Sequence, residues 1–207
     1  RSGPHRIGYE LGVAPSTVHV VLRRAGLSRL GDLDGPTALP VRYVRDRPGE
    51  LVHVDVKKLN RLPPGGGWRV LGRAEGRKNN PKRLGLGQDF LHVAIDDATR
   101  LAFVAVHPDE KGDTCAQFIE QAAVFFAAAG IDTIERVMTD NAKNYVISRS
   151  FQAALAGLGA RHKVTRPYRP QTNGKAERFN RTMANEWAYG RSYTTNDERL
   201  AALPAWV

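Results

Sequence analysis

Residues 51–57 read LVHVDVK, an alternation of apolar and polar side chains with a period of two. This period is typical of a half-buried β-strand, which requires a sheet beside it and a core beneath it. One face of the predicted strand carries Val52, Val54 and Val56, and the other carries Leu51, His53, Asp55 and Lys57. An aspartate is unfavourable inside a strand unless something compensates its charge. Asp55 therefore has two interpretations. In one it lies near a turn or at an exposed edge of the sheet, and in the other it is a ligand.

The rest of the chain supplies the partners that this strand needs. The predicted elements are, in order, strands at 90–95 and 101–106, a helix over 114–130, a strand at 134–139, a helix over 151–158, a strand at 163–165 and helices from about 174 and 196. Thr114 and Gln117 match a capping box at the start of the first of these helices. Asp96 and Asp97 fall between two strands, where turn chemistry competes with metal ligation. This order predicts an α/β fold.

A basic, proline-interrupted loop and an abrupt helix start share residues 166–180, RPYRPQTNGKAERFN. The helix is predicted to open near Gly174. Its buried face carries, at helical spacing, Ala176, Phe179, Met183 and Trp187. Glu177 therefore lies at the edge of the core. It is either a solvated first-turn acid that suits the helix dipole or a metal ligand, and the second interpretation needs partners elsewhere.

Composition narrows the classes of partner. The 207 residues include 31 lysines and arginines against 21 acids, a net charge of +10, which favours a polyanionic partner such as nucleic acid; a merely basic protein is the alternative. The single cysteine, Cys115, excludes a disulfide framework and a cysteine-based zinc site, and predicts intracellular residence. We find no membrane span or signal peptide in the sequence. The chain begins at Arg1, which we interpret as the start of a fragment.

Residues 1–30 are predicted to form a partial helix-turn-helix, followed by a linker at 31–49. Gly8 is small where two helices would cross, and Gly12 marks the turn. The second helix is expected to begin around Pro15 and Ser16, with Ser16 as N-cap or N1 residue. If this helix enters the major groove, it brings to DNA the side chains of Ser16, Thr17, His19, Val20 and Arg23. An ordinary helical hairpin is the alternative.

The second predicted domain, 50–207, contains a basic insertion at 58–88. The cations available to contact a nucleic-acid backbone are Arg61, Arg69, Arg73, Arg77, Lys78, Lys82 and Arg83. Because a structureless loop of this length is unusual inside a compact domain, we predict a β-hairpin arm that contacts a nucleic-acid backbone. A solvated insertion is the alternative.

Three motifs carry a family resemblance: HVDVKKL around Asp55, MTDNAKNY around Asp140 and RPQTNGKAERFN around Glu177. The chain resembles the DDE transposases and retroviral-type integrases, and the helix-turn-helix makes it most similar to the bacterial insertion-sequence branch. The resemblance implies a ribonuclease H-like mixed sheet flanked by helices, preceded by a small helix-turn-helix remnant. It also implies a cytoplasmic, DNA-associated bacterial protein that acts as a homo-oligomer.

The resemblance further implies that Asp55, Asp140 and Glu177 bind two Mg²⁺ or Mn²⁺ ions, with Asp55 bridging both. Hard oxygen ligands suit these ions, which promote phosphoryl transfer in pairs. The implied reaction is hydrolysis at transposon DNA ends followed by strand transfer to target DNA. The alternatives are a nuclease without strand transfer and a non-catalytic DNA-binding relic or regulator. Candidate supporting or DNA-contacting residues are His53, Asn141, Arg69, Arg166, Arg169, Asn173, Lys175 and Arg178.

Overall fold

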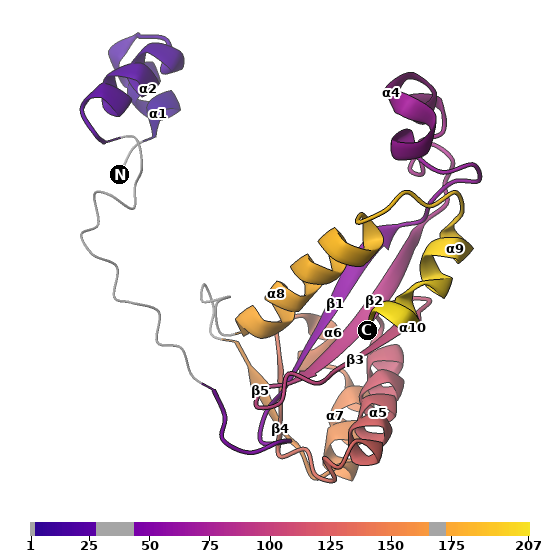
Figure 1. Cartoon of the computed structure of the whole chain (residues 1–207). Coiled ribbons are helices and arrows are strands. Elements are labelled where there is room, and N and C mark those ends of the chain that lie inside the picture. Colours follow the sequence, from indigo (N-terminus) through magenta and orange to yellow (C-terminus); the bar gives the residue numbers. More distant parts are fainter. Residues whose placement is uncertain (1–2, 28–43, 166–172) are drawn as a thin grey trace. The chain divides into compact units, whose positions relative to one another are not determined.

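The computed structural model describes residues 3–27, 44–165 and 173–207, and the chain divides after Tyr43 into two compact units (Figure 1). Most of the predicted linker, at 31–43, therefore lies outside the described residues. Among the described helices, none has both the length and the apolar character that a membrane crossing requires.

The described part of the first unit, residues 3–27, forms two helices, α1 (Pro4–Leu11) and α2 (Pro15–Arg24). Gly12 ends α1 in the left-handed conformation, with φ of 65°. A Cβ atom on Gly8 would lie 2.6 Å from the carbonyl oxygen of Val13, so the turn passes too close for any larger residue. The N-cap of α2 is Ala14, which corrects the expected place of Ser16: it lies inside the helix and caps nothing. DNA binding by this helix pair stays a prediction.

A five-stranded sheet forms the centre of the second unit, in the order β3-β2-β1-β4-β5. Its strands are β1 (Val52–Asn60), β2 (Gln88–Asp96), β3 (Ala102–His107), β4 (Arg136–Thr139) and β5 (Arg161–Val164). The first three strands pair antiparallel, whereas β1, β4 and β5 pair parallel. The α/β architecture and the mixed sheet are thus confirmed.

Helices cover the two faces of this sheet, and each covers its own apolar cluster. Val52 and Val54 pack with α5 (Gly112–Ala128) and α7 (Arg149–Gly157) on one face. Leu91 and Val93 pack on the other face with α8 (Gly174–Met183), which runs along β1 and β2 in Figure 1. The remaining elements of this unit are α4 (Trp68–Lys78), α6 (Lys143–Val146), the π-helix η2 (Ala184–Ala188), α9 (Asn196–Ala201) and α10 (Leu203–Trp206). The alternation of β1 therefore decides which side chains meet α8.

The start of α5 differs from the prediction. The helix begins at Gly112 with Lys111 as its N-cap, so the proposed capping box of Thr114 and Gln117 is wrong. The Thr114 hydroxyl instead donates to Asp109 Oδ1 at 2.6 Å. Cys115 is buried in the core, and burial raises the pKa of its thiol to about 11.

The basic insertion is helical, so the predicted β-hairpin arm is wrong. β1 and β2 stay paired out to Asn60 and Gln88, and residues 61–87, here called the arm, project from that end of the sheet (Figure 1). Gly65 and Gly66 have φ of 80° and 82°, and this left-handed backbone turns the chain into α4 instead of continuing a strand. Asn79 then donates through Nδ2 to the carbonyl oxygens of Pro64 and Gly66 and fastens the far end of α4 to its start.

Candidate active site

Asp55 lies on the face of β1 that meets α8, and strand register brings Asp140 to the same level. The parallel pairing of β1 with β4 sets Val52 opposite Val137 and His53 opposite Met138. The same register, extended by two residues, sets Asp140 opposite Asp55. Paired residues of parallel strands point to the same side of a sheet, and the charge of Asp140 does act on Asp55.

Helix α8 brings the third acid. Ala176 and Met183 bury its apolar face against the sheet. The Asn180 side chain donates through Nδ2 to Asp55 Oδ2 at 2.7 Å, which fixes the helix directly over Asp55. Glu177 is exposed and lies three residues before Asn180, so it is on the same side of the helix.

The three acids interact electrostatically. The pKa of Asp55 is raised to about 6, first by burial and then by the charges of Asp140 and Glu177, while hydrogen bonds from the Val56 N–H and from Asn180 oppose the shift. Neighbouring carboxylates raise the free-energy cost of ionising one another, and bound cations relieve this repulsion. Within residues 3–27, 44–165 and 173–207, no three His, Cys, Asp or Glu side chains are gathered tightly enough to hold a metal ion.

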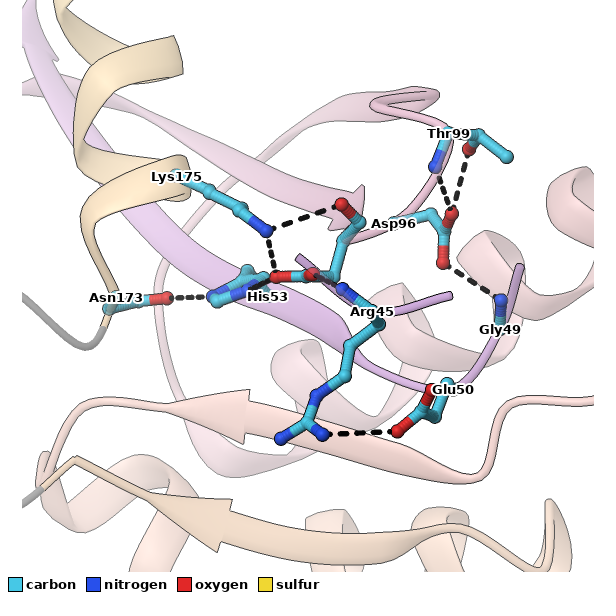
Figure 2. A network of polar contacts seen from close by, with 9 residues as sticks. Arg45, Gly49, Glu50, His53, Asp96, Thr99, Asn173 and Lys175 are labelled. Atoms are coloured by element: carbon cyan, nitrogen blue, oxygen red, sulfur yellow. Dashed lines mark hydrogen bonds and ion pairs between the residues drawn. The ribbon is translucent and has the colours of Figure 1, made fainter. Parts of the chain in front are cut away.

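A buried polar network joins Asp97, just after β2, to His53, two residues before Asp55 on β1. It ties the start of α8 to the sheet through Asn173 and Lys175 (Figure 2). Asp97 Oδ1 lies 2.7 Å from His53 Nε2 and forms an ion pair with Lys175, and Asp97 Oδ2 accepts from the backbone N–H of Arg45 at 2.7 Å. His53 Nδ1 lies 3.0 Å from Asn173 Oδ1, while Asn173 donates to the Val54 carbonyl. The first residues of α8 are thus anchored independently of the Asn180 contact.

The neighbouring Asp96 makes a different set of hydrogen bonds. Its Oδ2 accepts from both the N–H and the hydroxyl of Thr99, which is the turn chemistry expected for this position. Its Oδ1 accepts from the Gly49 N–H at 2.8 Å. Asp96 therefore closes the turn between β2 and β3 and attaches the segment that leads into β1, as Figure 2 shows. All four carboxylate oxygens of Asp96 and Asp97 thus have partners within the protein.

The network shifts the acid–base properties of its members. Burial would raise the pKa of Asp97, but hydrogen bonds from Lys175 and His53 lower it below its ordinary value. Burial lowers the pKa of His53, in spite of its contacts with Asp97 and Asn173. Burial also lowers the pKa of Lys175. The charge on Asp97 is therefore the one that this site stabilises.

The other predicted site residues fall into three groups. Those exposed on α2 are Ser16, Thr17, His19 and Arg23. In the second unit, Arg178 is exposed, Asn141 donates to the Thr165 carbonyl, and Asn173 and Lys175 make the internal contacts described above. Arg166 and Arg169 lie outside the described residues.

Two residues of the site were not assigned from the sequence. Asn180 is buried beside Asp55, and the signal for it was a polar residue on the Glu177 side of an amphipathic helix. Asp97 was weighed as a turn residue, yet its side chain is fully buried among partners from three segments. A buried carboxylate at a strand end was the available signal for it.

Comparison with known proteins agrees with this geometry. Residues 45–170, more than half of the chain, match the family model described as "Integrase core domain", and residues 158–207 match a second model of that description. The Retrovirus-related Pol polyprotein from transposon TNT 1-94 of Nicotiana tabacum is 33% identical over 103 residues, which are 48% of this chain and 7% of the polyprotein. The chain thus spans a small part of that curated relative.

Solved structures share the fold. A chain of the simian T-cell lymphotropic virus intasome superimposes with a TM-score of 0.53 at 17% identity, over 97% of this chain and 66% of that one. The catalytic core domain of BIV integrase gives a TM-score of 0.44 at 18% identity, over 75% of this chain and 83% of that one. The first of these likenesses, together with the mixed sheet, supports a ribonuclease H-like fold.

Proposed function

Because the chain belongs to the integrase core domain family, whose chemistry is polynucleotidyl transfer, we propose that it is a transposase. In this proposal it hydrolyses a phosphodiester at a transposon DNA end and joins the freed 3′-hydroxyl to target DNA. Asp55, Asp140 and Glu177 are the proposed catalytic residues. The reaction requires Mg²⁺ or Mn²⁺ and takes place in a homo-oligomer on DNA.

One observation carries the proposal. Asp55 is a half-buried acid whose pKa is raised to about 6 by burial and by the two acids that occupy the other motif positions. A protein has no structural need to place three carboxylates where they repel one another. Divalent cations remove this repulsion, and a pair of them can activate the attacking hydroxyl and stabilise the leaving oxygen.

The residues present fit such ions in kind. Carboxylate oxygens are the donors that Mg²⁺ prefers, and this ion usually keeps several bound waters. The side-chain oxygen of Asn180 is buried beside Asp55 without a hydrogen-bond partner among the described residues. It is a suitable acceptor for a water molecule on an ion held by Asp55.

The test is Mg²⁺-dependent cleavage of a transposon-end duplex, followed by joining of a pre-cleaved end to target DNA. Asp140→Asn and Glu177→Gln should eliminate both steps, and wild-type rates in these variants would refute the proposal. Cleavage without joining would favour the nuclease alternative. DNA binding with neither step, even in Mn²⁺, would favour the non-catalytic alternative.

Replacing Asn180 with alanine should weaken activation by the metal. The variant loses a hydrogen bond to the Asp55 carboxylate, and loss of such an outer contact typically costs about 10- to 100-fold in metal affinity or activity. The measurement is the Mg²⁺ concentration that gives half-maximal cleavage. Asn185→Ala, which removes an exposed asparagine one turn further on, is the matched control. Equal metal requirements in the two variants would contradict the role of Asn180.

A further inference from the structure

We propose that the arm carries a stacking site for an unpaired nucleotide of the DNA, built on Trp68 and flanked by Arg73 and Arg77. This inference deepens the proposed function, since it rests on DNA as the partner. It assigns to the arm a form of DNA, single-stranded or locally unpaired, that the catalytic carboxylates do not specify.

The first step is the unusual exposure of Trp68. This side chain is 52% exposed, although a tryptophan ring is among the largest apolar surfaces that a protein can bury. Val70 and Leu71, on the same turn, are also exposed. The apolar surface of α4 thus faces outward at this end, where it requires an explanation other than core packing.

The second step is that Trp68 is held in place despite its exposure. The guanidinium carbon of Arg69 lies 4.7 Å from the Trp68 ring centroid and 4.9 Å from that of Tyr189, so the arginine stacks between two aromatic rings. A Cβ on Gly76 would lie 2.4 Å from the Trp68 Cα atom, which shows how closely the second half of α4 packs on the tryptophan backbone. A rigid aromatic ring loses little entropy when it binds a ligand.

The third step is the surroundings of the ring. Trp68 lines two cavities. One, of about 220 Å³, also contacts Arg69 and Tyr189, and the other, of about 250 Å³, is lined by Trp68, Arg73, Gly76, Arg77 and Asn80. The second cavity therefore combines an aromatic surface, two cations and an amide. This is the combination with which proteins bind unpaired bases, because the ring stacks on the base while arginine contacts the phosphate.

Charge favours nucleic acid over a protein partner. The exposed cations of the arm beyond Trp68 are Arg69, Arg73, Arg77, Lys78, Lys82 and Arg83. The one acid in that stretch, Glu75, pairs with Lys78. An exposed aromatic ring within such an excess of positive charge matches a polyanion with aromatic bases.

Strand geometry places the stacking site relative to the chemistry. The part of β1 between Asp55 and Asn60 leads to the start of the arm. These five residues of strand span about 16 Å. This length corresponds to roughly five base steps of duplex at 3.4 Å each. The nucleotide held by Trp68 is therefore expected at least about five positions from the scissile phosphate.

The test is binding of a fluorescein-labelled single-stranded oligonucleotide, and of the same sequence as a blunt duplex, by the full chain in the Asp55→Asn background. Trp68→Ala should weaken single-strand binding by about 5- to 150-fold, the equivalent of one lost stacking contact, and should change duplex binding much less. Trp68→Tyr keeps an aromatic ring and should retain most of the affinity. Lys111→Gln, which removes an exposed charge far along the chain, is the control and should bind both forms as the background does.

The arginines provide a second measurement that does not depend on the fold of the tryptophan variant. Arg73→Gln and Arg77→Gln should each reduce the slope of log affinity against log salt for the single strand by about 0.7. Unchanged single-strand affinity in Trp68→Ala, or equal losses on single strand and duplex, would overturn the proposal. Because the assay requires no cleavage, loss of this binding site and failure of the transposase proposal are separate results.

Discussion

Asp55→Asn should abolish the activity of this protein and at the same time stabilise it. In the proposed reaction Asp55 would be one of the residues that hold the metal ions, so loss of its carboxylate should slow cleavage by on the order of 1,000-fold or more, equivalent to about 4 kcal/mol of transition-state stabilisation. Cleavage of an end duplex in Mg²⁺ measures this loss. Activity within tenfold of wild type would contradict it.

The gain in stability follows from the raised pKa. Asp55 has an ordinary pKa of 3.8 and a pKa of about 6 in the folded protein, so folding disfavours its ionised form. Below about pH 4 the group is protonated in both states and has no unfavourable effect. As the pH rises through 6, the Asp55 carboxyl of the folded protein loses its proton, and burial then disfavours the charge. The wild type becomes less stable by at most about 3 kcal/mol relative to the asparagine variant.

Chemical unfolding of both proteins between pH 4 and 8 in EDTA measures this difference. Mg²⁺ should reverse it, because an ion at 100 times its dissociation constant stabilises the wild type by about 2.7 kcal/mol and the variant much less. A constant difference across this pH range would contradict the electrostatic account. Lys57→Gln, a change two residues along β1 from Asp55, controls for a general effect of charge on the strand.

Asp97→Ala should destabilise the fold and impair catalysis, whereas Asp96→Ala should destabilise it only. Removing the Asp97 carboxylate deprives His53 and Lys175 of a buried partner, and breaking a buried ion pair typically costs about 3–5 kcal/mol. The start of α8 then loses its anchor on the sheet. Since Glu177 lies on that first part of the helix, the rate at saturating Mg²⁺ should also fall, by about 10- to 100-fold.

The neighbouring acid provides the matched comparison. Asp96 is equally buried, but its side-chain oxygens accept hydrogen bonds from Gly49 and Thr99. Both variants should therefore unfold at lower denaturant concentration, and only the Asp97 variant should show a reduced rate when assayed well below its unfolding transition. Equal rates in the two folded variants would mean that the network stabilises the sheet without positioning α8.

Local patterns predicted the elements that depend on local forces. The alternation around Asp55 gave the strand and its two faces, and the apolar spacing after Gly174 gave the buried side of α8. The arm could not be predicted in this way, because its shape depends on Gly65 and Gly66 adopting left-handed backbone and on long-range contacts such as Arg69 with Tyr189. Thr114 failed as a cap because the helix begins two residues before it, at Gly112.

The site shows the same limit more strongly. Asp55 and Asn180 are 125 residues apart in sequence, and His53 and Asn173 are 120 apart. No periodicity links such residues; they meet because β1 is central in the sheet and α8 crosses it. The family resemblance supplied Asp55, Asp140 and Glu177 with His53, Asn173 and Lys175 as candidate supporting residues, but it supplied neither Asn180 nor Asp97.

The closing pair of Asn60 and Gln88 has a wider consequence. β1, which carries Asp55, is fully paired with β2 before the arm begins. Inserting or replacing residues between Asn60 and Gln88 therefore leaves the strand register unchanged. Substrate preference could therefore diversify in this part of the chain without new selection on the catalytic centre. For the same reason, the arm is the place to graft a different DNA-reading module onto an otherwise unaltered enzyme.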